Sequence, residues 1–63
     1  KIMKIVQIEE SDVIKNICND VPVFRLKVDD CHICNLQDKS IKTIKRDMQN
    51  DVQYLYFILV EGE

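Results

Sequence analysis

The hydrophobic pattern is strongest at the C-terminal end of the chain, where every residue from 54 to 60 is apolar. Successive side chains of a β-strand point to opposite faces, so this run divides into two apolar sets. One set is Tyr54, Tyr56, Ile58 and Val60, and the other is Leu55, Phe57 and Leu59. An unbroken apolar run of this kind is typical of a strand whose two faces are both buried. The run therefore predicts a strand that begins near Gln53 and needs a cover on each side.

The start of the chain predicts a strand followed by a short helix. Residues 2–9 have apolar positions on both faces at a period of two, which favours a strand whose first half is the better buried. Ser11 can cap the helix that follows, and Pro22 cannot continue it. The expected apolar face of this helix comprises Val13, Ile14, Ile17 and Cys18.

Residues 23–28 alternate strictly between apolar and polar side chains, which predicts a strand with one face in water. We expect the inward side chains to be Phe24, Leu26 and Val28, and the outward ones to be Arg25 and Lys27. Asp29 and Asp30 come next, and Asp tolerates the backbone conformations of tight hairpin loops. The pattern therefore predicts a hairpin whose second strand covers residues 31–36.

A second helix is predicted after Asp38 or Ser40, either of which can cap it. Its apolar positions recur at helical spacing and form one stripe, which favours a helix lying on a sheet with one face down. The stripe comprises Ile41, Ile44 and Met48, and Val52 continues its spacing just past Asn50 and Asp51, which end the helix.

The order of elements is therefore strand, helix, strand, strand, helix, strand in a single α+β domain over residues 1–63. This order matches the split βαβ, ferredoxin-like arrangement, a four-stranded, mostly antiparallel sheet with two helices on one face. The usual strand order places the last strand at an edge, although here the last strand is the most apolar one. Exposed apolar edges invite pairing with another chain. We therefore expect a homodimer that continues the sheet or packs against its open face.

The length of 63 residues limits how much apolar surface the chain can hide. A domain of this size buries only about 60% of the surface of its unfolded chain. It therefore has too few residues to cover both faces of the last strand. The sequence predicts an interface, with a second copy or with a larger protein, formed by Tyr54, Tyr56, Phe57, Ile58 and Val60.

Charge and composition restrict the setting more than the activity. The net charge of −2 lacks the basic field typical of nucleic-acid binders, so we expect no nucleic-acid partner. No apolar run reaches the roughly 18 residues of a membrane span, and no secretory leader pattern is present. The odd number of cysteines, three, argues against a disulfide framework. We expect a cytoplasmic protein with no membrane contact.

The thiols and the single histidine form a weak metal alternative. Cys18, Cys31, His32 and Cys34 would supply the ligand set of a Cys3His zinc site. On a strand, however, residues three apart point to opposite faces, so Cys31 and Cys34 could share an ion only on a tight turn. Free cysteine is also a common core residue, and we prefer to interpret these cysteines as core side chains.

The catalytic and cofactor patterns considered are each better explained otherwise. The single glycine excludes a phosphate-binding loop, and His32 would project from the face opposite its neighbour Cys31. The pair Asp29 and Asp30 suits a turn. We expect no enzyme activity and no cofactor. The second helix carries a basic outer face, Lys42, Lys45 and Arg46, which we interpret as a solvated face.

The sequence favours a non-enzymatic protein-binding module that inhibits a larger protein by occlusion. The absence of Ala and the abundance of Ile, Lys, Asp and Asn are typical of AT-rich coding DNA. This bias points to a low-GC bacterium or its phages and plasmids, and suggests a small accessory protein that inhibits a host defence protein. The alternative is a metal- or nucleic-acid-binding regulator that uses the thiols with His32, or the basic helix face.

Overall fold

A computed structural model describes residues 2–50 and 52–62, and Asp51, expected to help end the second helix, lies outside them. Its strands are β1 (Ile2–Ile8), β2 (Val23–Lys27), β3 (Ile33–Asn35) and β4 (Tyr54–Gly62). Its helices are α1 (Val13–Cys18) and α2 (Ile41–Met48), with short 3-10 turns η1 (Glu10–Asp12) and η2 (Leu36–Asp38). The α+β class and the element order are confirmed. None of the described helices has the length and apolar character needed to cross a membrane.

The strands form one antiparallel sheet in the order β1-β4-β2-β3. Strand β4 is therefore internal, with β1 on one side of it and β2 on the other, and β1 and β3 are the edge strands of the sheet. The expectation that the last strand lies at an edge and is completed there by another chain is wrong. The central place suits β4 because it is the longest and most apolar strand. There its first part pairs with β2, its last part pairs with β1, and residues 56–58 pair with both.

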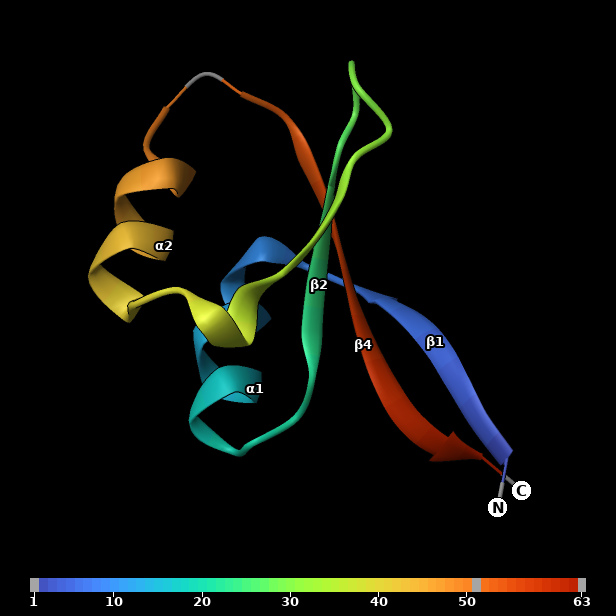
Figure 1. The fold of residues 1–63 in the computed structure, drawn as a ribbon. Helices are drawn as coiled ribbons and strands as arrows, with labels where there is room; N and C mark the ends of the chain where they lie inside the picture. The colour runs from blue at the N-terminus through green and yellow to red at the C-terminus, as the bar shows by residue number, and fades with distance from the viewer. Residues whose placement is uncertain (1, 51, 63) are drawn as a thin grey trace.

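Both helices lie on the same side of the sheet, as predicted (Figure 1). The first and last described residues lie together because β1 and β4 are neighbours, with Ile2 paired to Gly62. This outer part of the β1–β4 pair extends beyond the helices (Figure 1). On the opposite side of the sheet, no element of the described chain forms a second layer.

The core lies between the helices and the sheet. Its buried side chains come from α1, β2, η2, α2 and β4, in that order Val13, Val23, Leu36, Ile44 and Tyr56. Ile58, two residues after Tyr56, packs against this cluster from the same strand face. The division of the last strand into two apolar faces is confirmed, and the helices cover one of them.

The helix ends show which capping predictions hold. The Ser40 Oγ accepts a hydrogen bond from the Thr43 amide at 3.2 Å, so Ser40 caps α2 as expected. Ser11 does not cap α1, because it lies inside η1 and the cap position is taken by Asp12, without a side-chain hydrogen bond. Helix α1 closes with Asp20 in the left-handed region (φ 60°), a common helix stop.

Candidate functional site

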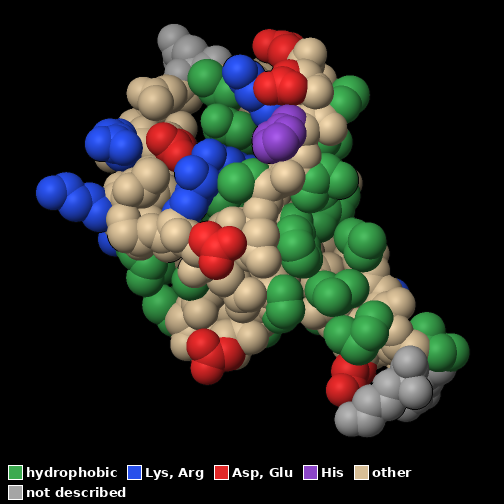
Figure 2. All heavy atoms as spheres, viewed as in Figure 1, with side chains coloured by type: hydrophobic (Ala, Val, Ile, Leu, Met, Phe, Trp, Pro, Cys, Tyr) green, Lys and Arg blue, Asp and Glu red, His purple; other side chains and the backbone are tan. Residues whose placement is uncertain are grey.

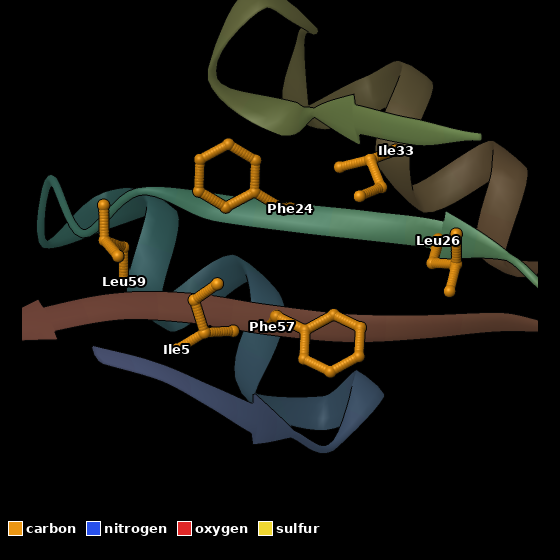
Figure 3. A pocket seen from close by; sticks show the side chains of 6 residues that line it. All are labelled: Ile5, Phe24, Leu26, Ile33, Phe57 and Leu59. Carbon is orange, nitrogen blue, oxygen red and sulfur yellow. The ribbon is translucent and has the colours of Figure 1, made fainter. Parts of the chain in front are cut away.

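The uncovered side of the sheet carries apolar side chains from each of its strands. Facing pairs across the register share one face, and these pairs include Ile5 with Leu59 and Phe24 with Phe57. We call the apolar part of this surface the open face; it consists of Met3, Ile5, Phe24, Leu26, Ile33, Leu55, Phe57 and Leu59. The register places three polar residues on the same side of the sheet, Gln7 beside Phe57, Asn35 beside Phe24 and Glu61 beside Met3. Figure 3 shows side chains of this face standing on the side of the sheet away from the helices.

The open face is exposed and hollowed. Ile5 and Ile33, on the two edge strands, are 71% and 67% exposed. Between them lies an open hollow of about 490 Å³, lined only by apolar side chains from all of the strands (Figure 3). In the space-filling view, hydrophobic side chains form a broad band on the side away from the helices (Figure 2). Large contiguous apolar patches on a folded chain mark contact sites for other molecules.

The predicted interface residues do not gather on this surface. Of that set only Phe57 belongs to the open face. Tyr56 is 3% exposed under the helices, and Tyr54 and Ile58 pack against the core. Val60 follows the same alternation as Ile58. The sequence separated the two apolar sets of β4 correctly, but the helices cover the tyrosine set, so the surface lies on the other one.

Strand β2 has the opposite orientation to the one predicted. Val23 is fully buried under the helices and Arg25 is 7% exposed, while Phe24 and Leu26 lie on the open face. Arg25 can face the core because α2 brings a carboxylate to it: Arg25 Nη1 lies 3.0 Å from Asp47 Oδ2. The guanidinium also lies over the Tyr54 ring, 4.3 Å from its centroid, a cation–π contact. These partners come from remote elements, so alternation along β2 alone could not reveal them.

Tyr56 provides a test of the covered face. Burial raises the pKa of Tyr56 above its ordinary value of 10.0, and the Glu10 carboxylate raises it further. As the pH rises past about 10, the unfolded state loses this proton first, so stability falls as the pH passes through the folded pKa. Urea titrations between about pH 9 and 12 should show a steeper loss of unfolding free energy in the wild type than in Tyr56→Phe. Tyr54→Phe is the matched control and should keep most of the steep loss, because Tyr54 raises the pKa of Tyr56 less than burial and Glu10 do. Equal slopes in all three proteins would contradict the assignment.

The cysteines and His32 are dispersed. Cys18 ends α1 and is exposed, Cys31 and His32 are exposed in the loop between β2 and β3, and Cys34 is half-buried on β3. The interpretation as core side chains is therefore wrong for Cys18 and Cys31. Within residues 2–50 and 52–62, no group of three or more His, Cys, Asp or Glu side chains is placed to hold a metal ion. Strand β3 is also shorter than predicted, because Cys31 takes a left-handed conformation (φ 52°) that extends the loop.

The basic residues of α2 lie away from the open face. Lys42, Lys45 and Arg46 are exposed. Cationic side chains gather on the helix side of the molecule in Figure 2. Asp47, on the same helix, points to Arg25 instead of joining this solvated surface. The open face and the basic face are thus on opposite sides of the protein.

Comparison of the chain with protein-family models, with curated protein sequences and with solved structures finds no match. The open face is therefore interpreted from its own geometry.

Proposed function

We propose that the chain is a non-enzymatic protein-binding module whose binding surface is the open face. The observation that supports this proposal best is an apolar sheet face without a cover, with Ile5 and Ile33 71% and 67% exposed. Burying apolar surface is the main favourable term in protein association. The occupant that suits such a surface is an apolar patch of another protein.

The open face is formed by the sheet itself, which favours binding. Its side chains stand on hydrogen-bonded strands, and residues 56–58 of the central strand β4 are paired on both sides. A preformed surface avoids the ordering cost that a flexible loop pays when it binds. The face can therefore bind a partner without first becoming ordered.

We further propose that binding inhibits the partner by covering part of its surface. The partner is then a larger host protein, and the chain an accessory protein of a phage or mobile element. The AT-rich residue bias supports this origin. We place the action in the cytoplasm, where the free cysteines stay reduced.

The test uses a matched pair of variants. Ile2 and Ile5 lie on the same strand, are 64% and 71% exposed, and point to opposite faces of the sheet. Wild type, Ile5→Glu and Ile2→Glu are tagged and used to capture host proteins. A protein lost selectively from Ile5→Glu is identified by mass spectrometry, purified, and titrated by calorimetry. We expect Ile5→Glu to weaken this complex at least about 100-fold, because it buries a charge, and Ile2→Glu to bind like the wild type.

Two results would overturn the proposal. One is a purified partner that binds Ile5→Glu as tightly as the wild type. The other is a capture in which Ile5→Glu loses no protein that Ile2→Glu retains. If the purified partner is an enzyme, its activity should fall in proportion to the fraction bound. Unchanged activity would contradict the proposal that binding inhibits the partner by covering part of its surface.

A further inference from the structure

We propose that a second copy of this chain covers the open face when the larger partner is absent, with the two sheets packed face to face about a twofold axis. The inference rests on the proposed function, since it assigns a second occupant to the same surface. Partner and second copy then compete, and the dimer is the resting form of the module.

The exposed area is the first argument. The chain has a mass of 7.4 kDa and exposes 4779 Å². A folded monomer of this mass exposes about 4,200 Å² on average. The excess of about 600 Å² approaches the roughly 800 Å² that each partner contributes to a stable interface of standard size. The surplus over the average is therefore somewhat smaller than one side of a standard interface.

The distribution of charge is the second argument. Around a twofold axis each central residue meets its own copy, so a charge near the axis would face a like charge. The centre of the open face is uncharged, because Phe57 on β4 lies beside Phe24 on β2. Among the described strand residues, the charged side chain on this face is Glu61, which pairs with Met3 near the chain ends. The face is thus electrostatically compatible with itself.

The shape of the surface is the third argument. Two sheets packed face to face lie about 10 Å apart, and their inner side chains interdigitate. The apolar hollow of about 490 Å³ leaves room for side chains from a facing copy. The phenyl rings of Phe24 and Phe57 stand at this surface (Figure 3), where they can enter the hollow of the other copy.

Pairing along a strand edge is the competing arrangement. Strand β1 lies at one edge of the sheet, and a second β1 could pair with it. That arrangement would continue the sheet but leave both open faces in water, joined into a wider apolar surface. Face-to-face packing covers them, and we therefore favour it over the edge.

Sedimentation equilibrium of the purified chain and its variants distinguishes the arrangements. We expect the wild type at twice 7.4 kDa. Ile5→Glu on β1 and Ile33→Glu on β3 should both raise the dissociation constant at least about 100-fold. Ile2→Glu should remain dimeric, because Ile2 points to the other side of the sheet. Circular dichroism checks that the variants fold, as expected at positions this exposed in a single copy.

The outcomes separate this inference from the proposed function. A monomeric wild type overturns the dimer, yet the partner titration with Ile5→Glu still decides the proposed function. Loss of the dimer in only one of Ile5→Glu and Ile33→Glu shows edge pairing instead, and loss in neither excludes the open face. Isotope-filtered NMR on a mixed, labelled wild-type dimer needs no variant. It should show contacts between copies from Phe57 and Ile33 and none from Ile2, and the reverse pattern would contradict the packing.

Discussion

Replacing Asp47 by alanine should lower the free energy of unfolding by about 3 kcal/mol and the thermal midpoint by about 15 °C. The Arg25 side chain is only 9% exposed, and Asp47 Oδ2 lies 3.0 Å from its Nη1. This nitrogen is buried and makes no well-oriented hydrogen bond within the described residues, so the nearby charge compensates it. A single small core rarely supplies more than roughly 3–5 kcal/mol, so the variant should be close to unfolding. Urea and thermal titrations at fixed protein concentration measure the effect.

Two further variants control this prediction. Asp38→Ala removes an exposed carboxylate just before α2 and should change stability by less than about 0.5 kcal/mol. Adding Arg25→Met to Asp47→Ala removes both charges and should recover much of the loss, because an apolar side chain needs no ionic partner. If Asp47→Ala behaved like Asp38→Ala, the buried guanidinium would not depend on this carboxylate.

Ile44→Ala should cost about 3–4 kcal/mol of unfolding free energy, enough to leave a large unfolded population. Ile44 is fully buried in α2 and belongs to the cluster with Val13, Val23, Leu36 and Tyr56. The substitution removes buried methyl and methylene groups and leaves a cavity that the small core can fill only by shifting its elements. Chemical denaturation followed by circular dichroism gives the change directly.

Ile41→Ala is the matched control for Ile44→Ala. It is the same substitution in the same helix, but Ile41 is 36% exposed, so its expected cost is below about 1 kcal/mol. Equal losses at the two positions would mean that α2 is held by helix propensity and not by packing on the sheet. That result would contradict the position of the core.

The order of the helices and strands could be predicted from the sequence because the signals that define each element are local. Ser40 caps α2, Pro22 follows the end of α1, and the unbroken apolar run forms β4. Strand order was not readable, because pairing joins residues far apart in the chain. The central place of β4 depends on the free energy of the whole sheet, to which β1 and β2 contribute from remote positions.

The candidate site was predicted in part. The excess of apolar surface on the last strand indicated an uncovered face, and Phe57 lies on it. The rest of the open face comes from β1, β2 and β3, including Ile5 and Ile33. The orientation of β2 is the main difference from the prediction, because alternation along the strand places a charged side chain in water. Arg25 finds Asp47 and Tyr54 instead, and Phe24 and Leu26 are thereby turned outward.

The sequence alone determined that β4 has two apolar faces and that a chain of 63 residues has little with which to cover both. Periodicity and length are properties of the chain itself, so no knowledge of contacts was needed. Only the tertiary structure decided which face the helices cover and which strands complete the other. That choice depends on where α1, α2 and the Arg25–Asp47 pair come together, which no local pattern encodes.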